Sequence, residues 1–131
     1  MSLGNKADLD EVDFLQAFAE DKETSFIVGY LENINEGAKF LQVAEQCAAS
    51  KPVVVLKAGT TQAGAKAASS HTGSLAGADE AYTAAFKHSG VIRAENFERL
   101  FDYALALGMQ PLPSGNRLTI ITNAGGPGIM A

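Results

Sequence analysis

The sequence has little cysteine, a deficit of positive charge and no long apolar run. A single cysteine excludes an internal disulfide framework, which needs paired thiols. Ten lysines and arginines against fifteen aspartates and glutamates give a net charge of −5, which argues against nucleic acid as a partner. No apolar stretch approaches the ~18 residues of a membrane span, and the first residues lack the features of a signal peptide. We therefore expect a cytoplasmic protein that does not engage a membrane.

The remaining composition is that of one folded domain. Hydrophobic residues make up 47% of the 131 residues and charged residues 19%, which excludes a disordered chain. A chain of this length buries roughly two-thirds of its unfolded surface, so it needs no disulfide to hold its fold.

Short apolar runs alternate with helical patterns along the chain. The β-rich runs, typical of buried strands, are residues 25–31, 53–56, 91–92 and 117–122. The helical patterns are residues 10–19, 36–49, 77–88 and 97–107, and Asp10 is placed to cap the first of them. This alternation predicts an α/β fold: a three-layer flavodoxin-like or Rossmann-like parallel sheet with helices on both faces. Such sheets bind ligands beyond the carboxyl ends of their strands, where we expect the functional residues.

Several distinctive side chains are interpreted as structural. Cys47 lies on the apolar face of a predicted helix, which indicates a buried thiol. No second cysteine and no paired histidine supports a metal site. His88 falls in the last turn of a helix, where a partly positive ring is favourable. Core packing is predicted for the aromatic residues at helical spacing, which are Tyr82, Phe86, Phe97 and Phe101.

The most unusual segment, residues 65–77, is crowded with small side chains around His71. A neutral ring nitrogen needs no deprotonation before it attacks phosphorus, so His71 is a candidate nucleophile. Hydroxyls and free backbone N–H groups beside it can bind phosphate oxygens. These neighbours are Ser70, Thr72, Gly73 and Ser74. The alternative is a loop of small residues with an incidental histidine.

Glu32 follows directly after a predicted strand, where a residue facing a ligand belongs in this architecture. Its carboxylate could accept a hydrogen bond from one imidazole nitrogen and leave the other nitrogen free to attack. The alternative is a carboxylate of a surface loop.

A third candidate is the glycine cluster of Gly125, Gly126 and Gly128, which resembles a phosphate cradle only loosely. It lacks the Lys-Ser/Thr pair of a P-loop, and Pro127 removes one backbone donor. A tight turn from strand to helix is the alternative.

Together these residues resemble one known family. The stretch 69–77, SSHTGSLAG, is similar to the phosphohistidine loop of nucleoside-diphosphate-forming acyl-CoA synthetases, which are relatives of the succinyl-CoA synthetase α subunit. Further stretches that resemble the family, in order, are residues 2–8, 30–32, 37–41, 51–59 and 122–128. SSHTGSLAG is fairly specific, whereas the glycine cluster alone is not.

The resemblance implies a reaction and roles. In the family, acyl-CoA and phosphate give an acyl phosphate, whose phosphoryl group passes to the loop histidine and then to ADP or GDP, with magnesium required. By position, His71 would carry the phosphoryl group, and the carboxylate of Glu32 would orient the His71 ring. Gly125, Gly126 and Gly128 would open a helix facing the phosphorylated loop.

The resemblance also implies that the chain is part of a larger enzyme. We expect a domain at 1–112 that lacks the family's N-terminal strand, a linker at 113–116, and the start of the next domain at 117–131. CoA, the nucleotide and magnesium would bind to other domains, including an ATP-grasp module, and not to this fragment alone. The acyl group and the oligomeric state are left open.

Two other functions remain open. Proteins with the same domain arrangement can carry an acetyltransferase domain that acylates lysines, with the synthetase-like part serving as an acyl-CoA sensor. Retention of His71 favours catalysis, because a sensor has no need of it. A stand-alone nucleotide- or flavin-binding module is less favoured, because the loops after the strands lack an aromatic residue suited to stacking on a flavin.

Overall fold

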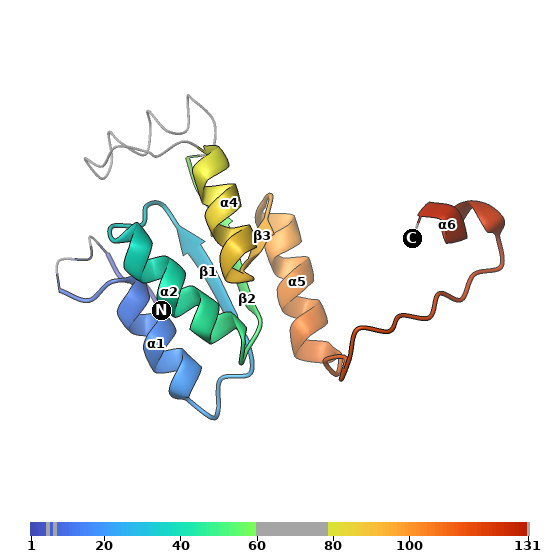
Figure 1. Ribbon diagram of the computed structural model, residues 1–131, viewed down its shortest axis with the longest axis horizontal. Helices are drawn as coiled ribbons and strands as arrows, with labels where there is room; N and C mark the ends of the chain where they lie inside the picture. Colours follow the sequence, from blue (N-terminus) through green and yellow to red (C-terminus); the bar gives the residue numbers. More distant parts are fainter. Residues whose placement is uncertain (5, 7, 60–78, 131) are drawn as a thin grey trace.

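The structure, a computed structural model, describes residues 1–4, 6, 8–59 and 79–130. In chain order the elements are α1 (Glu11–Glu20), β1 (Ile27–Leu31), α2 (Gly37–Ala48), β2 (Val53–Lys57), α4 (Asp79–Ser89), β3 (Ile92–Ala94), α5 (Phe97–Met109) and α6 (Gly125–Met130) (Figure 1). Asp10 caps α1 as predicted, accepting hydrogen bonds from the backbone N–H groups of Val12 and Asp13.

The three described strands form a parallel sheet in the order β1-β2-β3. The central strand β2 is buried along all five residues, as its unbroken apolar run predicts. Leu31 of β1 lies opposite Lys57 of β2, so the carboxyl ends of these two strands meet at the same edge. The predicted parallel α/β arrangement is confirmed.

One face of the sheet carries most of the core. Helices α1, α2 and α4 cover this face, and α5 lies on the other side (Figure 1). Phe40 of α2 and Phe86 of α4 pack edge to face with ring centroids 5.9 Å apart, and both are fully buried. Cys47 is also fully buried here, which confirms its structural interpretation, and burial raises the pKa of its thiol.

The second face is covered only in part. Leu100 of α5 packs with Val54, Leu56 and Ala94 against β2 and β3. Val28 and Tyr30 of β1 stay 38% and 48% exposed, because α5 sits over the other two strands. The predicted sheet with helices on both faces is therefore confirmed, and the helix on the second face covers β2 and β3 more fully than β1.

A stripe of large apolar residues on α5 also remains exposed. Phe97, Phe101, Leu105 and Met109 recur every four residues, and each is at least 55% exposed. The predicted burial of Phe97 and Phe101 is therefore wrong. The same helix offers a second stripe, containing Leu100, and that stripe is the one that faces the sheet.

The residues after α5 leave the sheet. Residues 117–122, predicted as a strand, form no strand and are exposed throughout, so that prediction is wrong for the described chain. A strand needs a neighbour to satisfy its backbone groups, and Figure 1 shows this segment running away from the sheet. The short helix α6 closes the segment. None of the helices within the described ranges is long and apolar enough to cross a membrane.

Candidate functional site

The carboxyl ends of β1 and β2 hold the backbone of Glu32 in place. The N–H of Ala58 donates to the carbonyl of Leu31 at 2.9 Å. The ammonium group of Lys57 donates to the carbonyl of Glu32 at 2.8 Å. Two consecutive carbonyls at the end of β1 are thus bound by the end of β2, so Glu32 leaves the sheet in a defined direction.

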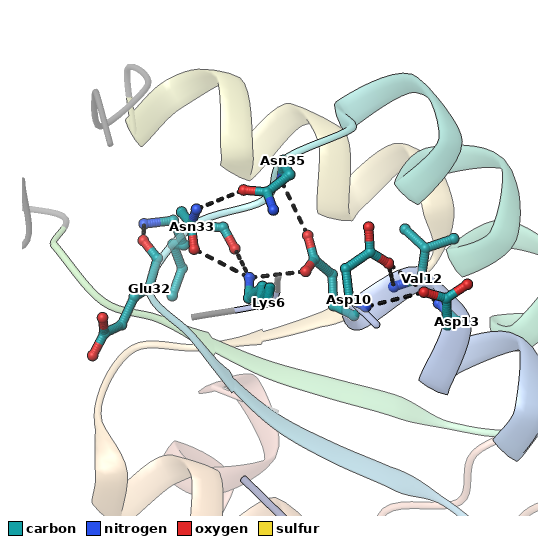
Figure 2. Close-up of polar contacts among 9 residues, drawn as sticks. Lys6, Asp10, Val12, Asp13, Glu32, Asn33 and Asn35 are labelled. Carbon is teal, nitrogen blue, oxygen red and sulfur yellow. Dashed lines mark hydrogen bonds and ion pairs between the residues drawn. The ribbon is translucent and has the colours of Figure 1, made fainter. Parts of the chain in front are cut away.

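The carboxylate of Glu32 is directed away from the polar network behind it (Figure 2). The side chain is half-buried, and no described residue donates a hydrogen bond to its carboxylate. With respect to the described residues, both carboxylate oxygens are therefore available to accept hydrogen bonds at this edge of the sheet. That is the position and the state required of a residue that orients a histidine ring.

A buried ion pair fixes the loop that follows Glu32 (Figure 2). Lys6 lies 2.8 Å from Glu11 of α1 and donates to the carbonyl and side-chain oxygen of Asn33 at 2.6 and 3.1 Å. Glu11 in turn accepts from the backbone N–H of Asn35 at 3.2 Å. Glu32 therefore lies between two anchors, one from β2 and one from the start of α1.

Lys57 is the least expected residue at this edge. It is 3% exposed, and its ammonium lies 4.6 Å from the centroid of the Tyr82 ring. Burial is the main cause that lowers the pKa of Lys57. The Asp79 carboxylate acts against this shift, and the Arg93 guanidinium reinforces it. A lysine that closes an otherwise apolar strand is a visible signal in the sequence, but Lys57 was not among the predicted site residues.

A second ion pair holds the start of α4. Arg93 of β3 lies 2.5 Å from the carboxylate of Asp79 and also donates to the Thr83 hydroxyl. Residues 60–78 are not described by the structure. Gly59, with a φ of +72°, is the last described residue before this segment, and Asp79 is the first one after it. Both covalent ends of segment 60–78 thus lie among residues held at or next to the carboxyl edge.

The predicted residues of segment 60–78 lie outside the described part of the chain, so the structure places none of them. They are His71 and its neighbours Ser70, Thr72, Gly73 and Ser74. Among the residues that are described, no group of three or more His, Cys, Asp or Glu side chains could hold a metal ion.

The glycine cluster lies on α6, which the described structure does not bring to the edge that holds Glu32 (Figure 1). A Cβ added at Gly125 or Gly126 would meet nothing within 4 Å among the described atoms, and neither residue has a positive φ. Neither crowding nor backbone conformation within the described chain requires glycine there. At Gly128 an added Cβ would lie 3.2 Å from the Thr122 side chain, so the phosphate cradle and the tight turn remain alternatives.

The fold and this edge define a class: a parallel α/β domain whose polar residues gather beyond the strand ends. Residues 1–107 match the family of succinyl-CoA ligase like flavodoxin domains, and the chain belongs to that family. It is 59% identical over its whole length to acetate–CoA ligase [ADP-forming] I of Archaeoglobus fulgidus, spanning 19% of that protein. It is 52% identical over its full length to 4-hydroxybutyrate–CoA ligase [ADP-forming] of Nitrosopumilus maritimus, again covering 19%.

A solved structure is similar over 98% of the chain. It is the dinucleotide-forming acetyl-coenzyme A synthetase 1 of Ca. Korarchaeum cryptofilum in complex with phosphate and ADP, with a TM-score of 0.84 and 47% identity. The chain spans 28% of that protein. All three relatives are thus several times longer than this chain.

Proposed function

We propose that the chain is the phosphohistidine-bearing domain of an NDP-forming acyl-CoA synthetase. The position of Glu32 carries the proposal. Glu32 is half-buried and lies at the strand end where its backbone carbonyl is tied to Lys57, three residues before segment 60–78 begins. Family membership and the names of the relatives, which are ADP-forming CoA ligases, support the reaction.

The proposed chemistry is two successive phosphoryl transfers through one side chain. A neutral nitrogen of His71 attacks the phosphorus of an acyl phosphate, the bond from phosphorus to the acyl oxygen breaks, and the carboxylate leaves. The phosphoryl group then passes from His71 to a nucleoside diphosphate, which restores the neutral ring. Catalysis of such transfers depends mainly on positioning and charge stabilisation.

Each candidate site residue has a defined role in the proposed reaction. The Glu32 carboxylate accepts a hydrogen bond from the second ring nitrogen of His71, which selects the tautomer and stabilises the ring as it becomes positive. Hydroxyl and backbone N–H groups hold the phosphoryl oxygens. These groups belong to Ser70, Thr72, Gly73, Ser74, Gly125, Gly126 and Gly128.

The other components belong to the longer enzyme under this proposal. CoA, the nucleotide and magnesium bind to further domains or subunits, an ATP-grasp module among them. Residues 1–112 form the phosphohistidine domain, 113–116 the linker, and 117–131 the start of the next domain. This division agrees with the exposed path of the chain after α5.

Histidine labelling tests the proposal directly. The full-length gene product, incubated with γ-labelled ATP and magnesium, is expected to acquire an acid-labile, base-stable label on His71. The sequence contains two histidines, so His88→Ala is a matched control for His71→Ala. His88 lies exposed in the last turn of α4 and should be dispensable.

We expect His71→Ala to abolish the label, His88→Ala to leave it intact, and Glu32→Gln to slow its appearance without unfolding the protein. Equal labelling of His71→Ala and wild type would refute the carrier role. An unlabelled wild type that still binds acyl-CoA would favour the alternative, a sensing module of a lysine acetyltransferase. The 131-residue chain alone is expected to remain unlabelled.

A further inference from the structure

The ammonium group of Lys57 contacts two backbone carbonyls and one aromatic ring inside the protein. An ammonium has three N–H donors. One reaches the carbonyl of Glu32 at 2.8 Å and another reaches the carbonyl of Ala58 at 2.5 Å. The third side of the group faces the ring of Tyr82, 4.6 Å from its centroid, at a distance typical of a cation–π contact. Within the described part of the chain, two carbonyls and an aromatic ring thus surround the ammonium group, which is the environment of a structural lysine.

A buried ammonium is an expensive way to satisfy two carbonyls. Removing a charge from water costs several kcal/mol unless good partners replace the water. Water or backbone N–H groups satisfy the carbonyls at most strand ends without that cost. Lys57 therefore does more than satisfy two carbonyls. Its charged ammonium group connects Glu32, the first residue after β1, to Ala58, the first residue after β2.

Those two residues are the ones that matter for the proposed reaction. Glu32 carries the carboxylate assigned to orient His71, and Ala58 lies two residues before segment 60–78. On α4, Tyr82 lies close to Asp79, where the chain returns from that segment. One ammonium group thus contacts the residue with the orienting carboxylate, the residue next to the start of the segment, and the helix at its end.

We propose that Lys57 is a positioning residue, which holds the backbone of Glu32 relative to the base of the segment that carries His71. The proposal rests on the function proposed above and deepens it. Lys57 contributes through Glu32, so its effect on phosphoryl transfer requires the Glu32 carboxylate to be present. Misplacement of a catalytic group by about 1 Å can reduce a rate by roughly 100-fold.

The chain offers a matched control at the other end of the same strand. Lys51 precedes β2 and also donates to two backbone carbonyls, those of Phe18 and Asp21. It therefore makes the same kind of contact far from Glu32. Removing either lysine leaves two carbonyls without their donor, but only Lys57 contacts the candidate site.

The experiment compares Lys57→Met, Lys57→Arg and Lys51→Met in the full-length gene product, by the rate of His71 labelling and by thermal unfolding. We expect His71 to be labelled roughly 10- to 100-fold more slowly in Lys57→Met than in wild type. Lys57→Arg should recover part of that rate because arginine keeps the charge and the donors. Lys51→Met should be labelled at the wild-type rate. In a Glu32→Gln background, Lys57→Met should cause little further loss.

Two results would overturn the proposal. In the first, Lys57→Met acquires the label as fast as Lys51→Met does. In the second, the fold-reduction in labelling rate of the double variant equals the product of the reductions in Lys57→Met and Glu32→Gln, which would show that the two residues act independently. If Lys57→Met does not fold, the same cycle is run with Lys57→Arg, and full multiplication of its loss with that of Glu32→Gln again refutes it. If wild type itself acquires no label on His71, the proposed function fails, and the role of Lys57 fails with it.

Discussion

The two ends of strand β2 carry the same residue type for different purposes. Lys51, at the amino end, is half-buried and donates to carbonyls at and just after the last turn of α1. Lys57, at the carboxyl end, is 3% exposed and donates to the carbonyls that follow β1 and β2. A lysine near a helix C-terminus is a common stabilising arrangement. That arrangement does not account for a buried lysine between two strand ends, which we propose positions Glu32.

The difference extends to the surroundings of each end. At the carboxyl edge the structure gathers two ion pairs, Lys6–Glu11 and Asp79–Arg93, in addition to Lys57. Near the amino end, Asp21 and Thr24 form a short exposed hydrogen bond of 2.6 Å. Among the described residues, more charged contacts thus lie at the edge where the function is proposed, and Lys6, Glu11 and Lys57 are the most buried of these charges. This pattern is common at functional sites.

The largest expected loss of stability comes from breaking the buried pair at the carboxyl edge. Lys6→Met leaves Glu11, whose side chain is 3% exposed, as a buried charge without its partner. We expect the free energy of unfolding to fall by about 3–5 kcal/mol, measured by urea denaturation. Arg99→Met is the control, because the Arg99–Asp102 pair is more than half exposed and should contribute less than about 1 kcal/mol. Equal losses in the two variants would contradict the comparison.

A smaller loss is expected at the start of α1, beside the same edge. Asp10 accepts two backbone hydrogen bonds and also has its N–H bound by Asp13, so Asp10→Ala should reduce the free energy of unfolding by about 1 kcal/mol. Glu36 precedes α2 and makes no side-chain capping bond, which makes Glu36→Ala the matched control with little effect. Chemical denaturation measures both variants. If Glu36→Ala reduced the free energy of unfolding as much as Asp10→Ala does, the stabilising role assigned to the Asp10 cap would be wrong.

The smallest effects concern pH: at both ends of the strand stability rises with pH, in the alkaline range for Lys57 and in the acid range for Asp21. Burial lowers the pKa of Lys57 below its usual 10.5, so between the two values the unfolded chain binds more protons and stability rises with pH. Hydrogen bonds from Thr24 and Glu23 lower the pKa of Asp21 below 3.8. Its stabilisation is therefore present above 3.8 and is lost as pH falls through the folded value.

Unfolding measured across pH checks these directions. Lys57→Met should flatten the alkaline rise and leave the acid limb unchanged, whereas Asp21→Asn should do the reverse. An alkaline rise of full size in Lys57→Met would mean that another group causes it.

Strands, helix caps and strand ends could be predicted from the sequence because neighbouring residues in the chain determine them. The unbroken apolar run of β2 predicted a strand buried on both faces, and Asp10 before a helical pattern predicted the cap. The position of Glu32 followed from a rule about parallel sheets, since the residue after a strand faces the ligand edge. Its role, like that of His71, stays a prediction.

Features that depend on neighbours were not predictable in this way. Helical spacing placed Phe97 and Phe101 in the core, but α5 has two apolar stripes and spacing does not say which one meets the sheet. The run 117–122 has the composition of a strand but no strand beside it to pair with. Lys6 and Asn33 are 27 residues apart, so nothing local indicated their contact.

The sequence by itself determined the types of the elements from α1 to α5, the parallel α/β class and the strand end at which Glu32 lies, because periodicity and burial are properties of short segments. Only the tertiary structure decided that a buried lysine joins the ends of β1 and β2, that Glu11 is paired with Lys6, and that one stripe of α5 stays exposed. The physical reason is the same in each case: the free energy of a charge or an apolar side chain depends on what surrounds it, and distant parts of the chain supply those surroundings.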